Sequence, residues 1–323
     1  MIYPRNTEID QRSSGMDPLS QTIALLRPRA LLWKQLDARG DWAVSFPGAT
    51  GVAFSLVAQG SCVFQSSGRE PQPLSEGDFL LQSEPQAWSL GRAVGTPSVV
   101  YDHARVQTGG EINYLHRDAP GPVTRIYGGR FVFEDAQADL SEGLFPPIVV
   151  VRAVDDGAAR LRSVLDLLGD EAAADRPGRS LLLERLLEVM LIQALRHASS
   201  GSVAGRQTLL AGLADTRIAA ALAAVHGDVF SRWSVAKLAA IAGMSRSAFA
   251  ERFSRVVGVA PMDYLLRWRM ALAKDALQFD GMRLVDVALR YGYSSVSAFS
   301  TAFTRTVGCP PSHYARRRAQ RQG

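Results

Sequence analysis

Residues 234–264 read SVAKLAAIAGMSRSAFAERFSRVVGVAPMDY, and residues 284–314 read LVDVALRYGYSSVSAFSTAFTRTVGCPPSHY. The second stretch repeats the first at a spacing of 49 residues for its leading glycine and serine and of 50 residues for the rest. One residue has therefore been inserted just after Ser294. The positions that recur are Gly243, Ser245, Phe249, Phe253, Gly258, Pro261 and Tyr264. This duplication indicates two copies of one supersecondary unit.

Each copy contains the parts of a helix-turn-helix. In the first copy we expect a helix over Val235–Ala242 to end at Gly243, which turns the chain, and Ser245 to cap the next helix. Phe249 and Phe253 lie one helical turn apart and face the core, which leaves the opposite face free to enter a major groove about 12 Å wide. The second copy has Leu284–Tyr291, Gly292, Ser294, Phe299 and Phe303 in the same roles.

The charge of the chain is divided between its two parts. Residues 206–323 contain 17 basic and 7 acidic residues, a net charge of +10, whereas residues 1–205 contain 19 basic and 24 acidic residues. A basic domain beside a weakly acidic one is typical of a protein in which one domain binds a polyanion. Residues 262–279 are predicted to form one helix that separates the units at 234–258 and 284–308, so that two recognition helices enter neighbouring major-groove segments.

The N-terminal part has a different periodicity, and we predict an α+β protein. Short apolar runs with glycine, proline and serine between them predict an antiparallel sandwich or barrel from Asp41 to Val151. The expected strands are Trp42–Phe46, Val52–Ala58, Cys62–Gln65, Asp78–Gln82, Val99–Tyr101, Thr124–Tyr127, Arg130–Phe133 and Ile148–Val151. Two flanking helices follow, at Ala159–Leu168 and Ser180–Ala198. The apolar stripe of the second, from Leu183 to Leu195, either covers its own barrel or forms a homodimer face.

Two domains follow from these patterns, a β-rich domain with flanking helices at 16–200 and an all-α domain at 206–323. The small-residue stretch Gly201–Gly205 is the predicted linker. Met16 is an alternative start to Met1. No segment predicts a membrane span or a secretory signal, so we expect a cytoplasmic protein.

The sequence contains little that predicts catalysis. Its five histidines, at 103, 116, 197, 226 and 313, lie far apart, and two cysteines are too few for a cysteine-based zinc site. The glycine-rich and nucleophile motifs of common enzyme families are absent. We therefore expect a protein that is not an enzyme and that has neither a metal nor a cofactor.

The C-terminal third resembles the AraC/XylS family of bacterial transcription regulators, through A..AGMS...F..RF....G..P..Y in the first unit and A...GY.S..AF..AF....G..P..Y in the second. The N-terminal part is similar to the cupin-type sensor domain of one AraC subgroup, through MDPLSQTIALLRPRA, GSCVF, LSEGDFLL and LLERLLEVMLIQALRHA. The resemblance implies that residues 16–200 form a cupin-like sensor and dimerisation domain, and that residues 206–323 form a DNA-binding domain with two helix-turn-helix motifs.

The resemblance also implies which residues meet the bases of DNA. They are Arg246, Ser247, Ala250 and Glu251 in the first recognition helix, and Val296, Ser297, Ser300 and Thr301 in the second. Arg246 could bond a guanine or only a phosphate, Glu251 could accept from a cytosine amine, and Val296 could touch a thymine methyl group. The first helix is therefore expected to supply most of the direct readout.

The leading hypothesis is a regulator that senses a small molecule or a redox signal in its barrel and binds promoter DNA. An alternative is a metal-independent cupin enzyme fused to a DNA-binding module, and a third is an architectural DNA-binding protein. Cys62 is either a buried hydrophobe or a thiol sensor. The aromatic residues of the barrel either line an effector site or fill the core. The expected partners are double-stranded promoter DNA, an unidentified effector, RNA polymerase and a second copy of the chain.

Overall fold

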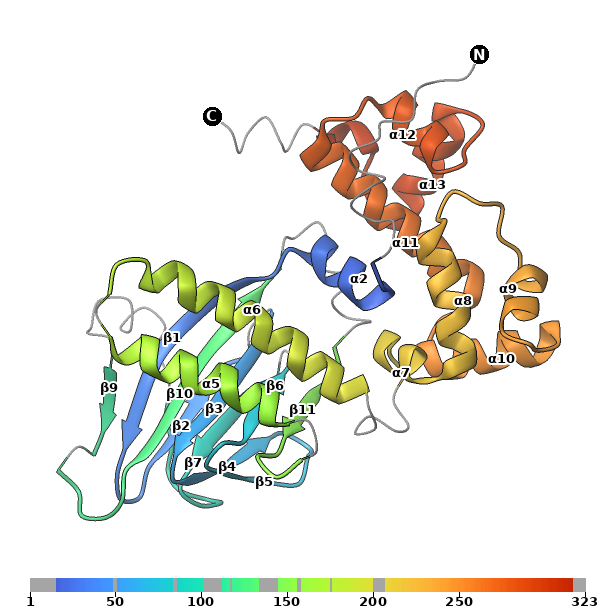
Figure 1. Ribbon diagram of the computed structural model, residues 1–323. Helices are drawn as coiled ribbons and strands as arrows, with labels where there is room; N and C mark the ends of the chain where they lie inside the picture. The colour runs from blue at the N-terminus through green and yellow to red at the C-terminus, as the bar shows by residue number, and fades with distance from the viewer. Residues whose placement is uncertain are drawn as a thin grey trace. The chain divides into compact units, whose positions relative to one another are not determined.

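The computed structural model describes residues 16–48, 51–83, 86–100, 112–116, 118–133, 145–155, 158–174, 176–199 and 207–315. The predicted linker Gly201–Gly205 and His103 lie outside these ranges. The described chain divides into two compact units (Figure 1). One unit comprises residues 28–133 and 145–199, and the other comprises 16–27 and 207–315.

The first unit is built on two sheets. Its strands are β1 (Arg29–Ala38), β2 (Ala43–Phe46), β3 (Val52–Gln59), β4 (Ser61–Ser66), β5 (Gln72–Ser75), β6 (Phe79–Gln82), β7 (Trp88–Gly91), β8 (Val99–Val100), β9 (Ile112–Leu115), β10 (Thr124–Val132) and β11 (Ile148–Val151). The six-stranded sheet has the order β11-β6-β3-β10-β1-β9, and the five-stranded sheet has the order β5-β4-β7-β2-β8. Pairing is antiparallel except for β1 with β9 and β2 with β8, so the expected antiparallel β architecture carries a parallel strand on one edge of each sheet.

Side chains that alternate along the strands fill the space between the two sheets. The cluster there includes Trp42, Phe46, Phe64 and Trp88, and the rings of Phe46 and Trp88 stack with centroids 4.1 Å apart. Strand β3 is buried on both of its faces, because the opposite face of its sheet is covered by α5 (Ala158–Ala173) and α6 (Arg179–His197), as Figure 1 shows. The rings of Trp42, Phe46, Phe64 and Trp88 therefore fill the core between the sheets.

Helix α6 buries most of its apolar stripe within its own unit. Leu187, Met190 and Leu191 are each almost fully buried, and α6 packs against β1 and β11. This packing favours the first of the two interpretations of the stripe, in which it covers the barrel. A homodimer face remains a prediction, and the exposed side chains Leu181, Leu182 and Val189 lie elsewhere on the helix.

The second unit is helical. Its elements are α2 (Pro18–Leu26), α7 (Leu209–Ala214), α8 (Thr216–Gly227), α9 (Val235–Ile241), α10 (Arg246–Val257), α11 (Pro261–Asp275), the π-helix η3 (Ala276–Asp280), α12 (Leu284–Arg290) and α13 (Val296–Val307). Helices α9 and α10 form one helix-turn-helix, and α12 and α13 form the other, as the repeat predicts. Together with the barrel, these helices give the predicted α+β architecture.

The two turns have the same geometry. After α9 the amide of Met244 donates to the carbonyl of Ala239 over 2.9 Å, and after α12 the amide of Tyr293 donates to that of Ala288 over 2.9 Å. Gly243 and Gly292 have φ values of +63° and +85°, which a side chain would oppose. These hydrogen bonds satisfy carbonyls that the helix ends would otherwise leave without partners.

Two expectations about this unit were wrong in detail. Ser245 caps α10, accepting a hydrogen bond from the amide of Ala248, but the cap of α13 is Ser295 and not Ser294. The inserted residue lengthens the second turn and moves its cap by one position. The connecting helix also changes form, because the α-helix ends at Asp275 and a π-helical turn follows it.

The phenylalanine pairs carry the packing of the recognition helices. Phe299 is fully buried beside Phe303, with ring centroids 5.5 Å apart. We expect Phe299→Ala to lower the free energy of unfolding of the helical unit by about 3–5 kcal/mol, through lost apolar contacts and the cavity left behind. Hydrogen exchange of the α12 and α13 amides in the full chain measures this change.

Thr301 is an exposed residue of the same helix, so Thr301→Ala is the matched control and should change that free energy by no more than about 0.5 kcal/mol. Equal protection factors in Phe299→Ala and the control would contradict the assignment of the helix faces.

Candidate nucleic-acid interface

The predicted base-contacting residues lie on α10 and α13, and four of them, Ser247, Glu251, Ser297 and Thr301, lie on the sides of these helices away from the phenylalanine pairs. Five of them are exposed: Arg246, Ser247, Glu251, Ser297 and Thr301. Ala250, Val296 and Ser300 are half-buried. Each helix thus presents a continuous outward face from its first turn, the geometry with which a recognition helix enters a major groove.

The two outward faces differ in chemistry. On α10, Arg246 is exposed in the first turn, and Glu251 faces Arg255 with 3.8 Å between the charged atoms. On α13 the hydroxyl of Thr301 donates to the carbonyl of Ser297, and Val296 packs partly against the core. The packing of Val296 reduces the apolar surface it can offer to a thymine methyl group. The first helix therefore offers charged groups, and the second offers mainly hydroxyl groups.

An ion pair that holds α10 against the start of α8 was not predicted from the sequence. Arg252 donates from Nε to Asp215 over 2.7 Å, and the same carboxylate caps α8 by accepting from the amides of Arg217 and Ile218. Burial alone would raise the pKa of Asp215, but the hydrogen bonds from Arg252 and these amides lower it below its ordinary value. The position of Asp215 directly before a helix could have predicted its role as a helix cap. Its ion pair with Arg252 could not be predicted, because the two residues are brought together only by the fold.

Helix α2 packs in the helical unit, although the sequence placed it in the domain at 16–200. Asp17 caps this helix, and Leu25 and Leu26 are buried as α2 packs on α8 and α11. A hydrogen bond of 3.1 Å joins Gln21 Oε1 to His226 Nδ1 of α8, and His226 Nε2 lies 2.6 Å from the hydroxyl of Tyr264. Residues 17–26 therefore complete the core of the helical unit.

The end of α2 is anchored where the connecting helix becomes π-helical. Arg27 lies over the ring of Phe279, 3.8 Å from its centroid, and forms an ion pair of 3.1 Å with Asp275. Burial raises the pKa of Asp275 to about 6, although Arg27 opposes the rise. The contact joins the N-terminal helix to the segment that separates the two recognition units.

Buried His226 predicts a pH dependence of stability. Burial lowers the pKa of His226 to about 3, and its ring stacks on Trp268 at 4.1 Å. In the unfolded chain the ordinary pKa is about 6.5. The stabilisation by neutral His226 is therefore complete above pH 6.5 and is lost as the pH falls towards 3, at about 1.4 kcal/mol per pH unit.

The variant His226→Gln isolates this effect, because the raised pKa of Asp275 acts in the opposite direction in both proteins. The difference in free energy of unfolding between wild type and His226→Gln should shrink by about 2 kcal/mol between pH 7 and pH 5. Hydrogen exchange of α8 and α11 amides provides the measurement. A difference that stays constant with pH would show that His226 is not held neutral by burial.

The barrel surrounds Cys62 closely. This side chain is 3% exposed within the cluster between the sheets, and burial, with the nearby Asp78 carboxylate, raises its pKa to about 12. A thiol with that pKa is a poor nucleophile at neutral pH, which favours the buried-hydrophobe interpretation over the sensor. Within the described residues, no group of three or more histidine, cysteine or acidic side chains is arranged to hold a metal ion.

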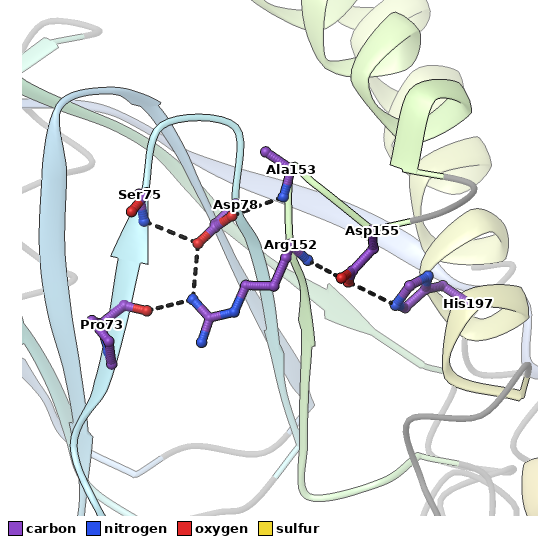
Figure 2. Close-up of polar contacts among 7 residues, drawn as sticks. All are labelled: Pro73, Ser75, Asp78, Arg152, Ala153, Asp155 and His197. Carbon is purple, nitrogen blue, oxygen red and sulfur yellow. Dashed lines mark hydrogen bonds and ion pairs between the residues drawn. The ribbon is translucent and has the colours of Figure 1, made fainter.

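A polar network links the rim of the barrel to the end of α6 (Figure 2). Buried Asp78 accepts from the amides of Ser75 and Ala153 and from Arg152, which also donates to the carbonyl of Pro73. Asp155 accepts from the amide of Arg152 and lies 3.2 Å from Nε2 of His197. The last turn of α6 is thereby fixed to the chain that follows β11.

Comparison with known proteins defines the class of this chain. Residues 17–200 match the cupin family, and residues 238–317 match a helix-turn-helix domain family. The protein thus combines a cupin domain with a DNA-binding domain. It belongs to the family of AraC-like transcription regulators, as its relatives show. It is 36% identical to an AraC-like regulator of Streptomyces lividans and 34% identical to one of Streptomyces antibioticus, each over 93% of this chain and 98% of the relative.

Solved structures include proteins similar to both parts of the chain. The DNA-binding domain of AdpA, solved with a target DNA, is 32% identical and covers 32% of this chain and 93% of that one, with a TM-score of 0.30. Fatty-acid-bound ToxT from Vibrio cholerae is 11% identical, and the match covers 89% of this chain and 95% of the ToxT chain, with a TM-score of 0.35. In the described part of this chain, no helix is long and apolar enough to span a bilayer.

Proposed function

We propose that this transcription regulator binds promoter DNA with both recognition helices, α10 and α13, in major grooves, and that its barrel unit responds to an effector. The observation that carries the proposal is the pair of outward helix faces in a domain of charge +10. A helical bundle without a nucleic-acid role requires neither a duplicated turn geometry nor an excess of arginine. Because the proposed partner is promoter DNA, the proposed location of the protein is the cytoplasm.

The division of labour between the helices follows from their side chains. Arg246 is proposed to bond a guanine or a phosphate, with Ser247, Ala250 and Glu251 beside it. Ser297, Ser300 and Thr301 offer hydroxyl groups or small surfaces, and Val296 offers part of an apolar one. The first recognition helix then contributes most of the sequence preference, and the second mainly positions the protein.

Regulation is proposed to begin in the barrel unit. Relatives over nearly the full length are named as transcription regulators, which supports a regulatory role over a cupin enzyme. The buried thiol of Cys62 favours a non-covalent effector over an oxidant. RNA polymerase and a second copy of the chain are further proposed partners.

If basic side chains contact the DNA phosphates, the affinity of the protein for DNA should depend strongly on salt concentration. Neutralisation of roughly 6–10 phosphates by the two units should give a log–log slope of binding constant against salt of about −5 to −9. Fluorescence anisotropy of the full chain on duplex DNA from the gene's upstream region measures this slope. A flat response, or no binding at 50 mM salt, would remove the basis of the proposed DNA contact.

The role of Arg246 has its own test. If Arg246 bonds a base, Arg246→Ala should cost about 1–3 kcal/mol on the preferred site and relax the preference at one base pair. Anisotropy titrations on sites changed one base pair at a time reveal it. Arg160→Ala, which removes an exposed arginine from α5 of the barrel unit, is the control and should leave all affinities unchanged. Uniform weakening across all sites would instead assign Arg246 to phosphate.

A further inference from the structure

An apolar pocket lies on the outer face of the six-stranded sheet, beneath α5 and α6. Its floor consists of Phe54 and Leu56 of β3 and Tyr127 of β10. Its roof consists of Leu168 of α5 and of three side chains of α6, Leu183, Leu187 and Met190. The pocket is separated by the sheet from the aromatic cluster that fills the barrel.

Two features leave room beneath the helices. Glycines contribute no side chains there, and α6 packs on strands to either side. In the sheet Gly129 is paired with Phe54, and by strand alternation it shares a face with Tyr127 and Phe131, so it contributes no side chain there. On α5, a Cβ atom added to Gly169 would lie 4.0 Å from the ring of Tyr127. Helix α6 packs on β1 and β11, whereas the pocket lies over β3 and β10 between them.

The pocket is small and can expand. About 290 Å³ of empty space lies at this place, but that figure includes open solvent, and the enclosed part has room for about one water molecule. Met190 forms part of the roof, and an unbranched methionine side chain changes shape at low cost. A molecule of about one aromatic ring therefore fits only after Met190 and the other side chains of the roof, Leu183 and Leu187, have moved aside.

The lining determines which molecules would be accepted. Six of its seven side chains are apolar, so an ionised group would lose its hydration without gaining a partner. Tyr127 is half-buried, and burial raises its pKa, so its hydroxyl stays protonated at neutral pH. One polar group of a ligand could therefore bond this phenol.

We propose that the pocket between the six-stranded sheet and helices α5 and α6 is a binding site for a small uncharged molecule with an apolar body and at most one polar group. The filled interior of the barrel supports this placement, because a ligand there would have to displace rings such as Trp42 and Phe64. A ligand beneath α6 only has to lift side chains of that helix.

The position of the pocket connects ligand binding to the DNA-binding unit, and this second step rests on the proposed function. Helix α6 supplies three of the pocket's side chains and ends at His197, which is fixed by Asp155. The chain then continues to α7 of the helical unit. A ligand that displaces the middle of α6 also shifts its last turn and so strains the contact between His197 and Asp155. The connection to α7 starts directly after this contact.

Methyl NMR of the full chain with labelled methionines tests the binding step. The probes are toluene, phenol and benzoate, and Met190→Leu assigns the Met190 signal among the seven methionines. Toluene and phenol should shift this signal in a saturable way, and benzoate should not. The absence of a saturable shift with toluene and phenol would overturn the proposed site.

Two variants locate the bound probe. Leu187→Phe fills the pocket and should weaken binding of both probes at least tenfold, or by about 1.4 kcal/mol. Leu165→Phe, the same change at a buried residue of α5 outside the pocket, is the matched control and should not weaken it. Tyr127→Phe should weaken phenol and spare toluene, a test that holds if Leu187→Phe does not fold. Equal effects of the two leucine variants, together with unchanged phenol binding in Tyr127→Phe, would place the probe elsewhere.

A DNA titration with and without saturating toluene separates the two proposals. A change in DNA affinity of at least threefold, lost in Leu187→Phe, would identify the pocket as an effector site. Unchanged affinity in a protein that binds both toluene and DNA would overturn the link to regulation. A protein that binds toluene but no DNA would overturn the proposed function and leave the pocket as a binding site.

Discussion

Burial of two phenylalanines, one helical turn apart, governs the DNA-binding unit. With Phe249 and Phe253 in one core and Phe299 and Phe303 in the other, each recognition helix can present only its opposite face to solvent. The glycine turns and serine caps before these helices fix where they start. The proposed contacts with DNA depend on this choice of face, because a helix rotated by half a turn would expose the rings and bury Ser247 and Glu251.

In the barrel unit the corresponding constraint is a sheet covered on both sides. Strand β3 sends alternate side chains into the aromatic core and towards α5 and α6, so both faces must be apolar. On the face towards the other sheet, close-packed side chains fill the space that a ligand would occupy. The second face is covered by helices that bridge a twisted sheet, and packing is less complete where two glycines contribute no side chains.

The N-terminal helix shows how one short segment can serve a domain distant in sequence. Helix α2 precedes the first barrel strand, yet its apolar side chains, Gln21 and Arg27 find their partners on α8, α11 and the π-helical turn. The DNA-binding unit is consequently assembled from both ends of the chain. Its stability should depend on residues that a C-terminal fragment would lack.

The sequence by itself determined the features that depend on local spacing, namely the duplicated helix-turn-helix, the buried phenylalanines, the charge division and most strands. Gly128 and Gly129 suggested a break, but β10 runs through them because neighbouring strands on both sides pair with it. The partner of α2, the burial of Cys62 and the pocket beneath α6 were decided only by the tertiary structure. These features depend on which side chains, far apart in sequence, fill a common volume, and a linear pattern of residue types does not contain that information.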